Sequence, residues 1–388
     1  MILSNLRILR LVPLIACTAL LAADADARPA EAPPAAPAPA AAMSTPPPAV
    51  AAETLTALPR GKGLPVVVRT GVCFVNLESV EENEGAFVAT IDLRVRWVDL
   101  RLRYAPAEAP DGFKEFRGAT AEARLAEMWA PDVLLTNMVG EPEYQVRGLR
   151  IYPDGRVELM QRTTARFATT FDVERFPFDR QKLKVEMVSR LESAERVAFD
   201  FRQDDLSFCK AAPGVGVDGW TTGLVDLRRE PEAGWYGDSH ARLVASLEVT
   251  RKPGTSLAPI FIPLFASLLI PLLAIWLNRV EDGEFQIEAF ELANVIIGGL
   301  FAVIALNFTV YSEYQMLASG DNLVARLFGL NYITLAVSLV TNIVLFHFQV
   351  LRKYFGKYVQ EQAYLFLVWA VPLLALVSAT ALLLVAMV

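Results

Sequence analysis

The sequence predicts an immunoglobulin-like β-sandwich outside the cytoplasm, followed by an all-α domain of four membrane-spanning helices. Short segments that alternate polar and apolar residues fill the first part of the 388-residue chain, and long uncharged runs fill its last third. Alternation at period two is typical of half-buried strands, whereas an apolar run of about 20 residues can cross a bilayer as a helix. Hydrophobic residues make up 54% of the chain, which is high for a soluble enzyme and low for a protein lying wholly in the membrane.

Residues 1–27 have the pattern of a secretory signal peptide. Arg7 and Arg10 precede an apolar run over 11–21, and Ala25-Asp26-Ala27 follows as a cleavage motif. We expect cleavage after Ala27. The rest of the chain is then exported, which predicts a multi-pass protein of a bacterial inner membrane with its N-terminal domain in the periplasm.

Residues 28–59 are mostly Ala and Pro and predict a flexible linker, because they lack the apolar bulk to form a core. We expect the β-sandwich over residues 60–254 and the transmembrane domain over residues 255–388.

Several segments of the β-sandwich region alternate at period two. Ile91 to Trp97 is the clearest strand, and after Trp97 the apolar positions change parity, which predicts a bulge or a change of sheet. The other predicted elements are strands within 157–167, 183–187 and 243–249, a turn at Pro153-Asp154-Gly155, and a short helix over 120–128.

The four predicted membrane helices cover about 257–278, 286–312, 325–351 and 364–386. The third carries polar residues that we expect to form hydrogen bonds between helices: Asn331, Tyr332, Thr341 and Asn342.

The second membrane helix has one face that does not suit lipid. Steps of three and four residues give the stripe Glu288, Glu291, Asn294, Gly298, Phe301, Ala305 and Phe308. Carboxylates at a membrane boundary are costly unless they face water or each other. The stripe therefore predicts either the wall of a water-filled pore or an ordinary bundle helix whose glutamates lie in the membrane interface.

Composition excludes several classes of function. The net charge of −7 argues against a nucleic-acid partner. The chain has no P-loop, HExxH motif or nucleophile elbow and only two histidines, so we expect neither an enzyme nor a cofactor. Two cysteines remain after the signal peptide, Cys73 and Cys209, and the sequence does not decide whether they pair.

Three motifs resemble those of pentameric ligand-gated ion channels. They are Trp97-Val98-Asp99-Leu100-Arg101-Leu102, Trp129-Ala130-Pro131-Asp132, and Phe176-Pro177-Phe178-Asp179-Arg180-Gln181. Four membrane segments follow them in the order of that family. Thr169 and Leu183 stand where the animal receptors have a disulfide, so the chain is similar to the prokaryotic members.

The resemblance implies a homopentameric, cation-selective channel opened by a ligand or by protons. It implies a selectivity and pore lining at Glu291, Glu288, Asn294 and Gly298, because a ring of carboxylates attracts cations. It also implies a hydrophobic gate at Phe301, Ala305 and Phe308. A non-conducting membrane receptor of the same fold is the alternative, because the two phenylalanines can plug the pore.

The resemblance further implies a coupling site between the two domains. Glu82, Asp179 and Arg251 are its expected charged members, and Phe176, Pro177 and Phe178 form its loop tip. A partly buried carboxylate–arginine–carboxylate cluster is sensitive to loss of any one partner, because the others then lack compensation.

The expected ligand site carries few of the aromatic residues that the family uses to hold amines. Its candidates are Asp92, Thr136, Arg190, Trp235 and Tyr236. Glu81 and Glu84 are candidates for Ca²⁺, or simply members of a solvated turn. The expected stimulus is a small molecule, a proton or a divalent cation, and membrane lipid surrounds the outer helices. Arg352, Lys353 and Lys357 predict a cytoplasmic loop between the third and fourth helices.

Overall fold

The computed structural model describes residues 54–208, 215–277, 280–281, 284–285, 287, 289–318 and 320–387. The predicted signal peptide and most of the predicted linker lie outside these residues, as do Cys209 and Glu288. All contacts reported below lie within one unit, Glu53–Val388.

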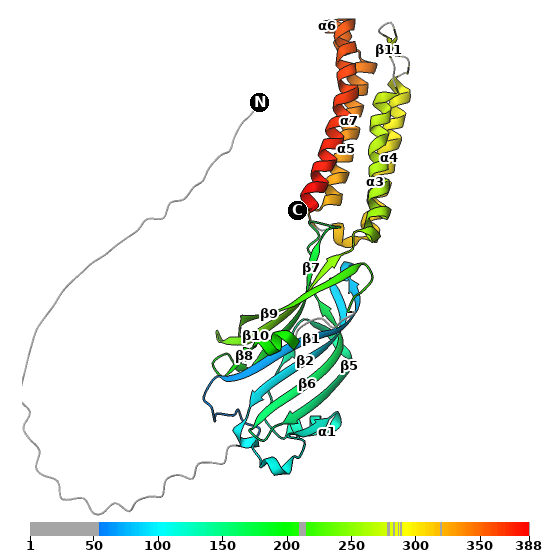
Figure 1. The fold of residues 1–388 in the computed structure, drawn as a ribbon. Coiled ribbons are helices and arrows are strands. Elements are labelled where there is room, and N and C mark those ends of the chain that lie inside the picture. Colours follow the sequence, from blue (N-terminus) through cyan, green and yellow to red (C-terminus); the bar gives the residue numbers. More distant parts are fainter. Residues whose placement is uncertain are drawn as a thin grey trace, which may run out of the picture. The chain divides into compact units, whose positions relative to one another are not determined.

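Two β-sheets form the first domain, as predicted (Figure 1). One sheet has six strands in the order β3-β5-β6-β2-β1-β8, and the other has four in the order β4-β7-β10-β9. Only the β1–β8 pair is parallel among these neighbours. The strand bounds are β1 Val66–Glu81, β2 Ala86–Val98, β3 Lys114–Arg117, β4 Leu134–Leu135, β5 Met138–Ile151, β6 Arg156–Ala168, β7 Arg180–Ser193, β8 Val197–Asp200, β9 Trp220–Ala233 and β10 Ser239–Arg251.

The core of this domain consists of the inward-facing residues of both sheets. In β2, every second residue from Ala89 to Trp97 is buried, which is the alternation that the sequence predicts. Phe87 stacks on Phe167 of β6 at 5.4 Å between ring centroids. The predicted short helix is present as α1, Ala119–Ala126.

The change of parity after Trp97 has a different cause from the predicted bulge. β2 ends at Val98, and Leu100–Leu102 forms a single 3₁₀ turn. Asp99 begins this turn, since its carboxylate accepts hydrogen bonds from the backbone N–H and the guanidinium of Arg101. Local capping therefore ends the strand, and no second strand pairing follows directly.

The β5–β6 turn needs its glycine. Gly155 has φ of +81°, and a Cβ atom there would lie 2.6 Å from the carbonyl oxygen of Asp99. Glycine tolerates both the positive φ and the close backbone approach. The turn predicted at Pro153-Asp154-Gly155 thus also fixes the end of β2.

Four helices are long and apolar enough to cross a membrane within the described residues. They are α3 Gly254–Trp276, α4 Ala289–Glu313, α5 Leu323–Thr341 with its π-helical continuation η5 Asn342–His347, and α7 Lys357–Met387. The short elements between them are the hairpin β11 Val280–Glu281 and β12 Glu284–Phe285, the 3₁₀ segment η4 Gln315–Ala318, and α6 Val350–Phe355.

The third membrane helix differs from the predicted uninterrupted segment 325–351. It ends as η5 at His347, and Gln349 adopts the left-handed conformation with φ of +49° before α6 begins. Gly356, at φ of +92°, then separates α6 from α7. Glutamine rarely adopts positive φ, so the sequence carries no signal for this break.

Hydrogen bonds and one glycine join α3 to its neighbours. Asn331 of α5 donates to the Leu264 carbonyl at 3.3 Å, and Ser338 donates to the Pro271 carbonyl at 2.9 Å. At Gly299 of α4, a Cβ atom would lie 2.7 Å from the Ile270 side chain. Small and polar residues therefore bring these helices close together, as is usual in membranes.

Candidate functional site

A buried ion-pair cluster lies where the first domain meets the helices. Arg251 is the last residue of β10, three residues before α3 begins. Its guanidinium binds both carboxylate oxygens of Glu82, at 2.8 and 2.7 Å, and both of Asp179, at 2.7 and 3.2 Å. The structure therefore brings together the three charged residues predicted for the coupling site.

The environment of this cluster favours its charged form. The Arg251 side chain is 6% exposed and that of Asp179 is 2% exposed. Two aromatic rings flank the guanidinium, with its carbon 4.8 Å from the Phe176 centroid and 4.2 Å from the Trp220 centroid. Burial opposes the charge of Arg251, but the hydrogen bonds and charges of Glu82 and Asp179 outweigh it and raise the pKa of Arg251.

The loop that carries Asp179 is closed at its base by one glutamine. The Gln181 amide donates to the Asp172 carbonyl and to the Asp179 carboxylate, both at 2.6 Å. Its amide oxygen accepts from the Asp172 backbone N–H at 3.0 Å. Gln181 thus fixes the loop ends and orients the carboxylate toward Arg251.

The tip of the same loop belongs to the hydrophobic core of the helical domain. Phe176 is fully buried there, and its ring lies 6.4 Å from the ring of Tyr314 after α4. Pro177 is also buried, and Phe178 packs at the edge of the cluster. The loop therefore contacts the helices with its rings while its carboxylate holds Arg251.

A second contact comes from the β1–β2 turn, η1 (Glu82–Glu84). The Asn83 amide donates to the carbonyl of Glu313 at 3.1 Å, and its oxygen accepts from the Met316 N–H at 3.3 Å. Glu313 is the last residue of α4. The turn that carries Glu82 is therefore bound directly to the end of that helix.

Replacing Asn83 by alanine is expected to loosen the end of α4 without unfolding the protein. Asn83 is exposed, so only its two hydrogen bonds are lost, each contributing about 1 kcal/mol. Amide hydrogen exchange of a peptide covering residues 313–318 should accelerate by up to about thirtyfold, the factor that corresponds to about 2 kcal/mol. Asn83→Asp, which retains the acceptor for Met316, should exchange more slowly than Asn83→Ala. Equal exchange in Asn83→Ala and the wild type would contradict this role.

Helix α4 presents the predicted polar-to-apolar stripe away from its own chain. Phe301 is 68% exposed and Phe308 is 77% exposed. The other described members of the stripe are exposed as well: Glu291, Asn294, Gly298 and Ala305. The face turned toward α3 and α5 is formed by other residues of α4, which are buried: Leu292, Ile296, Gly299, Val303 and Val310.

The residues predicted for a ligand site do not form one cluster in a single chain. Asp92 lies on β2 of the six-stranded sheet and binds Arg162 through two hydrogen bonds of 2.7 Å. Thr136 lies in the turn directly after β4 of the other sheet, and its N–H donates to the carbonyl of Glu186 in β7 at 2.9 Å. Hydrogen bonding to Asp92 raises the pKa of Arg162.

The remaining ligand-site candidates lie on β7 and at the β9–β10 hairpin. Arg190 of β7 lies 3.7 Å from the Glu232 carboxylate of β9. Trp235 and Tyr236, at the hairpin tip, are 89% and 93% exposed. Aromatic rings this exposed are available to a ligand or to another chain.

Glu81 and Glu84, the candidate calcium ligands, both bind Arg166. The Glu81 carboxylate lies 2.7 Å from Nε of Arg166, and the Glu84 carboxylate binds its Nη2. Within the described residues, no group of three metal-ligating side chains gathers. The arginine therefore compensates these carboxylates, and we do not assign a metal to them.

Sequence reasoning assigned no role to four residues of this region: Asn83, Gln181, Trp220 and Tyr314. Gln181 is the last residue of the Phe176–Gln181 motif, so its place in that motif could have indicated a role for it in the sequence. Asn83 and Tyr314 act through contacts between segments more than 100 residues apart, which no local pattern reveals.

Comparison with known proteins agrees with this architecture. Residues 56–253, just over half of the chain, match the family model described as "Neurotransmitter-gated ion-channel ligand binding domain". The match ends at the start of α3 and so covers the two sheets and the ion-pair cluster.

Individual relatives come from bacteria and mammals. A proton-gated ion channel of Gloeobacter violaceus is 24% identical over 69% of this chain and 67% of its own length. The theta subunit of a mouse gamma-aminobutyric acid receptor is 24% identical over 57% of this chain, and the bovine pi subunit is 30% identical over 34%. The chain spans about a third of the length of these two mammalian subunits.

Proposed function

The chain belongs to the neurotransmitter-gated ion-channel family, and we propose that it forms a homopentameric, cation-selective channel of a bacterial inner membrane. The family is pentameric, binds small-molecule ligands and consists of channels, so the chain is not an enzyme. We further propose that the sheet domain is periplasmic and that Arg352, Lys353 and Lys357 mark the cytoplasmic side.

The observation that carries the proposal is the exposed stripe of α4. A single chain leaves Glu291, Asn294, Phe301 and Phe308 without packing partners while burying the opposite side of the helix. Copies arranged around an axis would place this stripe on the axis, because the buried side of α4 packs against α3 and α5 and the stripe carries the polar residues that suit water and not lipid. The stripe then lines a pore with acid at one end and aromatic rings farther along.

In this proposal, the charge of a carboxylate ring determines ion selectivity, and the hydration of an apolar constriction determines whether the pore is open. A ring of Glu291 carboxylates, joined by Glu288, attracts cations and repels anions, and Asn294 and Gly298 lie beside the passing ion. Rings of Phe301 and Phe308, with Ala305 between them, close the pore when the apolar constriction dries.

Gating in this proposal passes through the Arg251 cluster. Arg251 lies three residues before α3, Phe176 packs against the helical core, and Asn83 binds the end of α4. Binding of a ligand or proton at Asp92, Thr136, Arg190, Trp235 or Tyr236 would reorient the strands that carry these contacts. A displacement of the sheets therefore reaches both α3 and α4.

Ion flux through reconstituted protein tests the proposal. Proteoliposomes with a tenfold salt gradient should show a reversal potential on the cation side, of roughly 60 mV for ideal selectivity, as external pH and calcium are stepped. A reversal on the anion side would contradict cation selectivity. A membrane that stays sealed under every condition would favour the non-conducting receptor, for which the two exposed phenylalanines of α4 supply the plug.

A further inference from the structure

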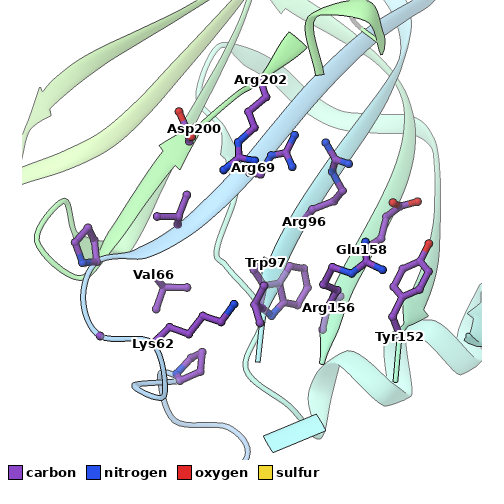
Figure 2. Close-up of a pocket in the computed structure, with 16 residues that line it drawn as sticks. Lys62, Val66, Arg69, Arg96, Trp97, Tyr152, Arg156, Glu158, Asp200 and Arg202 are labelled. Atoms are coloured by element: carbon purple, nitrogen blue, oxygen red, sulfur yellow. The ribbon is translucent and has the colours of Figure 1, made fainter. Parts of the chain in front are cut away.

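A pocket of about 530 Å³ lies in the sheet domain, outside the coupling site (Figure 2). It lies between the start of β1, the end of β2, the β5–β6 turn and the end of β8. Its volume falls in the range of small-molecule sites. None of the residues proposed for the ligand site lines this pocket.

Two cations of the pocket have no counter-ion. The side chains of Lys62 and Arg202 form no hydrogen bond or ion pair within the described part of the chain, and both are exposed. Figure 2 shows Lys62 extending toward Trp97 and Arg202 directed into the same space from the end of β8. Two uncompensated cations facing one cavity favour an anionic ligand.

Further arginines of the pocket are held in place. Arg69 of β1 and Arg96 of β2 bind Asp204 and Asp205 in α2 (Gln203–Phe208), with distances of 2.7 Å for Arg96–Asp204 and 2.9 Å for Arg69–Asp205. The hydrogen bond from Arg96, with the charge of Arg69, lowers the pKa of Asp204 to about 2. These ion pairs therefore persist at neutral and mildly acidic pH and keep the segment carrying Arg202 against the sheet.

The floor of the pocket is apolar. Val66, Trp97 and Val157 line it and are almost fully buried, so only the edges of these side chains face the cavity. A ligand would therefore meet apolar groups at the floor and cations nearer the rim.

We propose that this pocket binds a small carboxylate with an apolar, preferably aromatic, body. The carboxylate lies between Lys62 and Arg202, and the ring packs on the Trp97–Val66–Val157 floor. Two acids also line the pocket. Asp200 is compensated by Arg229 at 3.1 Å, whereas Glu158 of β6 lies on another part of the lining and orients the carboxylate away from it. The proposal concerns binding alone and does not depend on ion conduction.

Titration calorimetry with benzoate on the full chain in detergent tests the proposal. Benzoate should bind with a dissociation constant of about 1 mM or tighter, which requires less than the usual ceiling of binding energy per atom. Benzamide, with the same shape and no charge, and benzylamine, with the opposite charge, should bind at least about tenfold more weakly.

Variants of the pocket should change benzoate affinity in opposite directions. Arg202→Gln should weaken it by about tenfold or more, because a charged hydrogen bond is lost, whereas Glu158→Gln should strengthen it. Arg228→Gln, on exposed β9 and outside the pocket, is the matched control and should have no effect. Unchanged melting temperatures will show that the variants fold, since the Arg202 side chain forms no hydrogen bond or ion pair with the described residues. Equal binding of benzoate and benzamide, no binding of benzoate, or unaltered affinity in Arg202→Gln would overturn the proposal.

Discussion

Replacing Arg251 by glutamine is expected to destabilise the protein by about 3–5 kcal/mol and to abolish stimulus-evoked ion flux. The change leaves Asp179, at 2% exposure, and Glu82 facing each other without a cation. It also removes the charge that interacts with the rings of Phe176 and Trp220. Thermal melting in detergent and flux into proteoliposomes measure the two effects separately.

Arg180, the residue after Asp179, supplies the control for the loss of an arginine charge. Arg180 is exposed, and its nearest carboxylate, Glu248, lies 3.9 Å away. Surface ion pairs of this kind contribute little to stability. The free energy of unfolding of Arg180→Gln should therefore lie within about 0.5 kcal/mol of the wild-type value. If Arg180→Gln and Arg251→Gln had equal effects, the loss would reflect overall charge and not the cluster.

A double variant distinguishes stranded charge from lost packing. Glu82→Gln/Arg251→Gln should recover part of the stability that Arg251→Gln loses, because only one carboxylate then remains uncompensated. A double variant that is no more stable than Arg251→Gln would assign the effect to packing alone.

The sequence predicts those strands and helices whose buried face repeats at a regular spacing along the chain. Ile91 to Trp97 alternates because one face of β2 is buried, and the α4 stripe recurs because a helix turns every 3.6 residues. The Glu82–Asp179–Arg251 cluster was predictable only through family motifs, since its members lie 72 and 169 residues apart.

Other features depend on contacts that no local pattern contains. Asp99 ends β2 by capping a 3₁₀ turn. The residues of this turn no longer follow the alternation of the strand, and in the sequence this appears as a change of parity. Gln349 adopts positive φ without being glycine, so the break after η5 carries no composition signal. Asp204 and Asp205 bind arginines more than 100 residues away in the sequence, so no local pattern predicts the basic pocket.

Replacing Glu291 by glutamine is expected to move the reversal potential in asymmetric salt toward zero and to leave folding unchanged. Glu291 lies exposed in the first turn of α4, so the amide removes charge without disturbing a contact within the chain. In a pentamer the change removes five carboxylates from one ring, which is why the expected effect on selectivity is large. Asp321→Asn is the control, because Asp321 is an exposed acid paired with Arg326 at 2.7 Å and lies beyond the stripe. A reversal potential that is the same in Glu291→Gln and the wild type would place the selectivity filter elsewhere, and a shift of equal size in Asp321→Asn would attribute it to surface charge.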